Sequence, residues 1–199
     1  MKFFVNFLSA FRIAAAFAII PTLLFQMFWT TFILYVFAAV SDWFDGYLAR
    51  KYNVCSKLGG VMDHIGDKLL VANTLIMLAV MMPVWFVVVP IIIMIARELY
   101  ISGLREFLGT QKIEMPVPKA RFSMGKIKTT FQMISIGAFL LIFAIGAMIT
   151  PNTDSTLMLY LILSLPQIGI WGLWISLVAS IWSATQYTFT FVEKLKKIK

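Results

Sequence analysis

The strongest constraint on this chain is a series of long apolar stretches, each about long enough to cross a lipid bilayer. A membrane-spanning helix needs about 20 mostly apolar residues, and the 199-residue sequence contains six such stretches. Hydrophobic residues make up 61% of the chain, against about 45–50% in soluble domains. The sequence therefore predicts an all-α integral membrane protein with six transmembrane helices. The expected spans are residues 10–28, 31–50, 61–82, 84–104, 127–149 and 168–192.

Two segments outside these stretches are expected to lie at the membrane surface. The residues before position 10 are amphipathic and are expected to form an N-terminal juxtamembrane helix. Residues 155–166, which end at Pro166, are expected to form a short interfacial helix or loop. Arg12 interrupts the first apolar stretch, which together with the spans that follow argues against a cleaved signal peptide. Because the sequence shows no internal repeat, we expect residues 1–199 to form a single membrane domain.

The distribution of lysine and arginine predicts which side of the membrane the loops face. With six spans, all 17 basic residues fall on one side or in the half of the membrane nearest to it. The opposite turns, near residues 29–30, 82–85 and 150–156, contain none. Positive residues collect on the cytoplasmic side, so we expect both termini and the active site to be cytoplasmic. The net charge of +8 then indicates contact with anionic lipid headgroups rather than with nucleic acid.

Four of the nine acidic residues lie near the cytoplasmic ends of the second and third stretches: Asp42, Asp45, Asp63 and Asp67. The spacing within each pair, three and four residues, places both members on one face of a helix. The loop at 51–60 would make the two helices antiparallel neighbours, so the four carboxylates can meet. Carboxylates this close repel one another unless they are protonated or bound to cations.

A divalent metal would satisfy this cluster, but the cluster alone leaves other interpretations open. Cys55 and His64 are the only cysteine and histidine, so the ligands would be oxygens, which favours Mg²⁺ or Mn²⁺. The aspartates could instead line a transporter's cation path, or pair structurally with Arg97 or Lys68. The outer halves of the spans carry almost no charge except Asp154, which disfavours a transport path. A non-catalytic scaffold would not need four aspartates at these spacings.

A set of eight residues surrounds and includes these aspartates: Asp42, Asp45, Gly46, Ala49, Arg50, Gly59, Asp63 and Asp67. Their identity and spacing resemble the signature of the CDP-alcohol phosphotransferase family. The resemblance implies six membrane helices and a homodimer. It also implies that Asp42, Asp45 and Asp63 hold metal, and that Asp67 helps to hold it or acts as the catalytic base. We expect the CDP-lipid to bind at Gly46, Ala49, Arg50 and Gly59.

Two further segments, residues 96–107 and 125–132, resemble the family members that use glycerol 3-phosphate as the acceptor. The resemblance implies transfer of a phosphatidyl group from CDP-diacylglycerol to glycerol 3-phosphate, in a bacterial cytoplasmic membrane. The acceptor's phosphate needs cationic ligands, for which Arg97, Arg105 and Lys126 are the candidates. Arg97 and Arg105 are eight residues apart and share a face if one helix contains both. Free serine or choline is disfavoured as the acceptor, whereas inositol phosphate and phosphatidylglycerol, the acceptor in cardiolipin synthesis, remain open.

Overall fold

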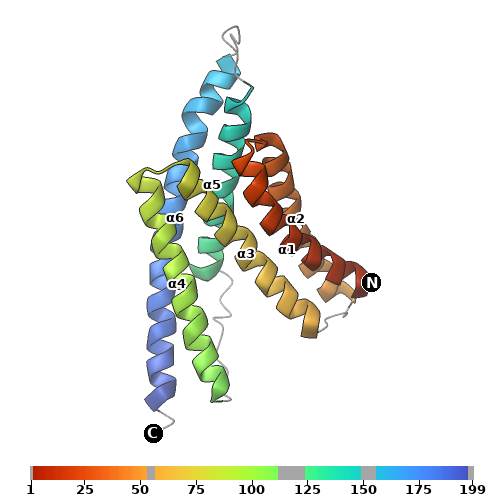
Figure 1. Ribbon diagram of the computed structural model, residues 1–199. Helices are drawn as coiled ribbons and strands as arrows, with labels where there is room; N and C mark the ends of the chain where they lie inside the picture. The colour runs from red at the N-terminus through yellow and green to blue at the C-terminus, as the bar shows by residue number, and fades with distance from the viewer. Residues whose placement is uncertain (1, 53–56, 112–123, 149–155, 197–199) are drawn as a thin grey trace. The chain divides into compact units, whose positions relative to one another are not determined.

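The computed structural model of the chain describes residues 2–52, 57–111, 124–148 and 156–196. Within these ranges, the side chains of residues 2–6, 42–52, 57–58, 156 and 196 are not described. The described residues form six helices (Figure 1), which confirms the all-α prediction. The helices are α1 (Lys2–Leu24), α2 (Phe28–Tyr52), α3 (Lys57–Met81), α4 (Trp85–Thr110), α5 (Met124–Gly146) and α6 (Thr156–Lys196).

Five of these helices, α1, α3, α4, α5 and α6, are long and apolar enough to cross a membrane. The apolar part of α2 found among the described side chains is Phe28–Ser41, shorter than a full span. The five long apolar helices indicate an integral membrane protein. The sixth span, predicted at residues 31–50, stays a prediction.

Two expected helix boundaries are absent from the described residues. The N-terminal amphipathic stretch and the first span form one continuous helix, α1, rather than two helices. Residues 156–166 are likewise the beginning of α6, which continues through Pro166, so the prediction of a separate interfacial segment is wrong. Proline is tolerated inside membrane helices because neighbouring helices and side chains satisfy the backbone groups that it frees.

The length of α6 sets a limit on how it can lie in a bilayer. Its 41 residues extend about 60 Å at roughly 1.5 Å per residue. The hydrocarbon core is about 30 Å thick. Only part of α6 can therefore be surrounded by lipid chains, even when the helix is tilted.

The described helices form two compact units. The first contains Met1–Met82 and Ile136–Gly169, and the second contains Pro83–Ser135 and Ile170–Lys199. Both α5 and α6 therefore contribute to both units. In the first unit, α1 packs most extensively against α3 and also against α2. The face of α1 that is buried recurs every three or four residues, as a helical period requires: Ser9, Arg12, Ala15, Ala16, Ile19 and Leu23.

The turn between α1 and α2 contains a C-terminal capping motif in which a glutamine has the left-handed backbone conformation. Gln26 has φ = 56° and is the only described non-glycine residue with positive φ. Its N–H donates to the carbonyl of Leu23 at 3.0 Å, and the Met27 N–H donates to the carbonyl of Thr22 at 2.8 Å. These two bonds define a Schellman motif, in which glycine normally occupies the left-handed position.

In the second unit, α6 packs closely against α5 and is tied to α4. A Cβ atom on Gly172 would lie 3.0 Å from Ser135 Cβ and 3.3 Å from the Phe131 carbonyl oxygen. The Trp174 indole nitrogen donates to the carbonyl of Phe86 at 3.1 Å. Small residues at such contacts allow membrane helices to approach closely.

Candidate active site

Asp63 and Asp67 lie one turn apart on α3 and share a cation from α1. Arg12 Nη1 donates to Asp63 Oδ1 at 2.6 Å and to Asp67 Oδ1 at 2.9 Å. Because one nitrogen reaches both carboxylates, the prediction that they share a helix face is confirmed.

Arg12 is much more buried than the two aspartates with which it pairs, and this difference bears on what the three side chains can bind. The Arg12 side chain is 0% exposed, whereas those of Asp63 and Asp67 are 43% and 42% exposed. A buried guanidinium is costly unless carboxylates pair with it, so the two aspartates allow Arg12 to be buried. The three side chains together carry one positive and two negative charges, so the net charge of this group is negative. That charge suits an additional cation.

The close approach of α1 and α3 positions Arg12 beside the carboxylates. A Cβ atom on Gly66 would lie 3.4 Å from Ile13 Cγ1 and 3.5 Å from Arg12 Cδ, which is ordinary van der Waals contact. About two turns further along α3, Asn73 Nδ2 donates to the carbonyl of Ala16 at 2.9 Å. These contacts fix the register of the two helices.

Arg12 was not among the partners that the sequence suggested for these aspartates, which were Arg97 and Lys68. The structure shows Arg12 paired with both Asp63 and Asp67. The signal that would have found it is the position of a cation inside the first apolar stretch. A charge there is costly without a buried partner.

The other signature residues fall where less is described. The C-terminal part of α2, whose side chains are not described, contains Asp42, Asp45, Gly46, Ala49 and Arg50. Gly59 is buried in the first turn of α3. Among the residues with described side chains, no three acidic, histidine or cysteine residues come together as a metal site. The meeting of all four aspartates therefore stays a prediction.

The two described carboxylates nevertheless fit a hard divalent cation. Mg²⁺ prefers oxygen ligands and is usually bound by one or two carboxylates together with substrate phosphates and water. Arg12 engages Oδ1 of each aspartate, and both carboxylates remain partly exposed. The donor set on this face of α3 is therefore compatible with the predicted metal.

The second unit contains two of the predicted acceptor-binding cations, Arg97 and Arg105, on one face of α4. Arg97 Nη2 donates to Ser183 Oγ at 2.9 Å, and Arg105 Nη2 donates to the Tyr187 hydroxyl at 2.9 Å. The Arg105 guanidinium carbon also lies 4.9 Å from the centroid of the Tyr187 ring. Because Ser183 and Tyr187 are one turn apart on α6, the prediction that the two arginines share a face is confirmed.

Glu98, for which the sequence predicted no role, contacts two cations in this unit. Arg97 Nη1 donates to Glu98 Oε1 at 2.9 Å, and Lys128 Nζ of α5 contacts the same oxygen. Lys128 is buried, whereas Lys126 is exposed. Two cations that contact the same oxygen atom are close enough to repel each other. The shared carboxylate therefore stabilises the pair, while the proposed role of Lys126 stays a prediction.

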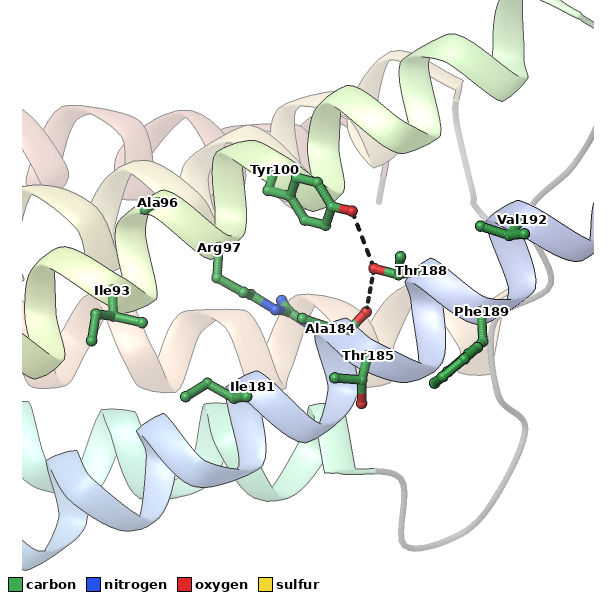
Figure 2. Close-up of a pocket in the computed structure, with 10 residues that line it drawn as sticks. All are labelled: Ile93, Ala96, Arg97, Tyr100, Ile181, Ala184, Thr185, Thr188, Phe189 and Val192. Carbon is green, nitrogen blue, oxygen red and sulfur yellow. Dashed lines mark hydrogen bonds between the residues drawn. The ribbon is translucent and has the colours of Figure 1, made fainter. Parts of the chain in front are cut away.

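An apolar groove lies between α4 and α6 beside Arg97 (Figure 2). Its volume is about 610 Å³, within the usual range for ligand sites. The Tyr100 hydroxyl and Thr188 Oγ1 are hydrogen-bonded across it at 3.2 Å, and Thr188 Oγ1 donates to the carbonyl of Ala184 at 2.9 Å. The remaining lining is mostly apolar and includes Ile93, Ala96, Ile181, Phe189 and Val192.

Comparison with known proteins extends this description to most of the chain. The enzyme named CDP-diacylglycerol–glycerol-3-phosphate 3-phosphatidyltransferase of Yersinia enterocolitica is 35% identical over 155 residues, which are 78% of this chain and 74% of the relative. The Arabidopsis thaliana enzyme of the same name with the number 2 is 35% identical, and the match covers 88% of this chain and 74% of that relative. The Rickettsia bellii enzyme of the same name is 40% identical, and the match covers 68% of this chain and 74% of that relative. A model of the CDP-alcohol phosphatidyltransferase family matches residues 3–182. With the signature aspartates and a match over nearly the whole sequence, this chain belongs to the CDP-alcohol phosphatidyltransferase family.

Proposed function

We propose that this protein transfers the phosphatidyl group of CDP-diacylglycerol to glycerol 3-phosphate, giving phosphatidylglycerophosphate and CMP. The relatives at 35–40% identity are named for transfer to this acceptor. The observation that carries the proposal is the Asp63–Asp67 pair, whose partly exposed carboxylates share one face of α3. In the family signature these positions belong to the reacting centre.

We assign metal binding to the four aspartates of the signature, Asp42, Asp45, Asp63 and Asp67. A bound Mg²⁺ or Mn²⁺ would neutralise the diphosphate of the CDP-lipid and favour the departure of CMP. The acceptor hydroxyl forms a new bond to the phosphatidyl phosphorus as the bond from that phosphorus to the CMP oxygen breaks. Asp67 accepts the proton of the hydroxyl, a role that suits a partly exposed carboxylate. By pairing with the two carboxylates, Arg12 helps to hold them in place.

The acceptor's phosphate is assigned to Arg97, Arg105 and Lys126. Arginine presents a planar set of donors that matches phosphate oxygens. The contacts of Arg97 with Ser183 and of Arg105 with Tyr187 support the assignment, because they orient both guanidinium groups toward α6. The CDP-lipid itself is assigned to Gly46, Ala49, Arg50 and Gly59.

The membrane arrangement follows from the same assignment. We propose six spans, with α2 as the sixth, both termini and the active site in the cytoplasm, and a homodimer in a bacterial cytoplasmic membrane. The lipid tails lie in a groove between helices that opens to the bilayer. The apolar groove between α4 and α6 supports this placement, because a surface of that composition is suited to hydrocarbon.

The test is CMP release by the purified protein in detergent with CDP-diacylglycerol and Mg²⁺. Glycerol 3-phosphate, inositol phosphate, serine and phosphatidylglycerol are offered separately as acceptors. We expect release with glycerol 3-phosphate alone, and no release after chelation of the metal. Release with a different acceptor would preserve the aspartate chemistry but overturn the acceptor. Folded protein that releases no CMP with any acceptor would instead support the transporter interpretation.

The role of Asp67 is tested separately with Asp67→Asn, which is nearly isosteric. We expect turnover to be abolished while the helical content is unchanged. Glu106→Gln makes the same chemical change at an exposed carboxylate of α4 and serves as the matched control. A rate for Asp67→Asn above half that of the wild type would remove Asp67 from the mechanism.

A further inference from the structure

One oxygen atom of Glu98 engages two cations that come from different helices. Arg97 Nη1 of α4 donates to Glu98 Oε1 at 2.9 Å, and Lys128 Nζ of α5 contacts the same atom. We propose that Arg97 and Lys128 together bind the phosphate of the acceptor and that Glu98 is the residue that positions them. This inference rests on the proposed function; in its acceptor site Lys128 takes the place of Lys126, and Glu98 is added as a positioning residue.

The charges of this cluster indicate an anionic ligand. Arg97 and Lys128 carry two positive charges and Glu98 one negative charge, so the three side chains have a net charge of +1. The side chains of Arg97 and Lys128 are 11% and 9% exposed, and buried charge is costly unless it is compensated. A phosphate monoester carries charge of the opposite sign to this cluster.

The hydrogen-bonding capacity of Arg97 is also incompletely used. Two of its nitrogens donate to Glu98 and Ser183. The third, Nε, is buried and has no hydrogen-bond partner among the described residues. Arg97 also lines the groove between α4 and α6 (Figure 2). A phosphate oxygen is a suitable acceptor for the remaining donor.

The geometry favours Lys128 over Lys126 as the partner of Arg97. Residues two apart on a helix point to different faces, so the two lysines cannot both approach Glu98 from α5. Lys126 is exposed, whereas Lys128 is buried and contacts Glu98. The backbone at Lys128 is also fixed, because Ser176 Oγ of α6 donates to its carbonyl at 3.0 Å.

The site as described selects acceptors by their phosphate group. An acceptor that carries a phosphate monoester gains charge-assisted hydrogen bonds from Arg97 and Lys128, whereas an uncharged alcohol gains none. Inorganic phosphate should therefore compete with glycerol 3-phosphate and should not compete with CDP-diacylglycerol.

The experiment measures kcat, the KM of each substrate and the inhibition constant of inorganic phosphate for five variants in detergent, of which Lys126→Met compares the two lysines of α5. Lys128→Met and Glu98→Gln remove one charge each from the cluster. Lys128→Arg tests whether an arginine, which keeps the positive charge, restores binding. Lys194→Met is the matched control on α6. We expect Lys128→Met and Glu98→Gln to raise the KM of glycerol 3-phosphate and the phosphate inhibition constant about tenfold or more, the effect of losing a charge-assisted hydrogen bond. The KM of CDP-diacylglycerol should change less than about twofold, a separation that a general loss of structure would not produce. Lys128→Arg should restore most of the affinity, and Lys194→Met should resemble the wild type.

An unchanged KM of glycerol 3-phosphate in Lys128→Met, or equal increases for both substrates, would overturn the inference. If Lys128→Met does not fold, an unchanged KM in folded Glu98→Gln overturns it instead. A larger effect from Lys126→Met than from Lys128→Met would also overturn it while leaving the proposed function intact. If the wild type uses another phosphorylated acceptor, the proposed function fails, and the same variants then test the phosphate site with that acceptor.

Discussion

The pairing of Arg12 with Asp63 and Asp67 makes a quantitative prediction about stability. Arg12→Met removes the buried charge but keeps a side chain of similar length, so the packing change is small. The substitution deletes two charge-assisted hydrogen bonds, of 2.6 and 2.9 Å, each worth about 1.5–3 kcal/mol when fully formed. Both carboxylates are more than 40% exposed and regain water when Arg12 is lost. We therefore expect a loss of about 2–3 kcal/mol in the free energy of unfolding, below the sum of the two bonds.

The assay is reversible unfolding in mixed micelles, followed by the helical circular dichroism signal. Because both bonds come from a single nitrogen, Nη1, the point charge of Arg12→Lys should preserve part of the stability. A double-mutant cycle between Arg12→Met and Asp63→Asn should give a coupling energy of about 1 kcal/mol or more. Phe17→Leu, at an exposed position of the same helix, is the control and should change stability by less than about 0.5 kcal/mol. A stability of Arg12→Met within that margin of the wild type, or no coupling with Asp63, would refute the reasoning.

Three other substitutions test packing, backbone conformation and acceptor binding. Gly172→Ala should lower stability by about 1–3 kcal/mol, since its Cβ would lie 3.0 Å from Ser135 Cβ. The control is Gly103→Ala, which should leave stability unchanged because its Cβ would have no neighbour within 4 Å. Equal losses of stability in the two variants would contradict the packing argument. Gln26→Gly should raise stability by about 1 kcal/mol in the same unfolding assay because it relieves the left-handed conformation, and a decrease would argue against strain at this turn. Arg105→Ala should raise the KM of glycerol 3-phosphate about tenfold, as expected for one lost charge-assisted hydrogen bond, and an unchanged KM in CMP-release kinetics would remove Arg105 from the acceptor site.

Features that depend on one helix at a time could be predicted from the sequence. The apolar stretches predicted the helices because apolar length and helical period are local properties. The same period placed Asp63 with Asp67, and Arg97 with Arg105, and the contacts with Arg12 and with α6 confirm both pairs. The boundary expected at Pro166 was wrong, since α6 continues through it. The local preference of proline is overridden where surrounding helices satisfy the backbone.

Features that depend on which helices pack together were decided only by the tertiary structure. Arg12 lies 51 residues before Asp63 in the chain, and no periodicity within either helix indicates that α1 packs against α3 at Gly66. The contact of Lys128 with Glu98 likewise depends on how α5 meets α4. The sequence by itself determined the helices, the faces of the carboxylate and arginine pairs, and the family signature. Their partners followed from side-chain packing between helices distant in sequence, because a buried charge is stable only where the fold brings an opposite charge to it.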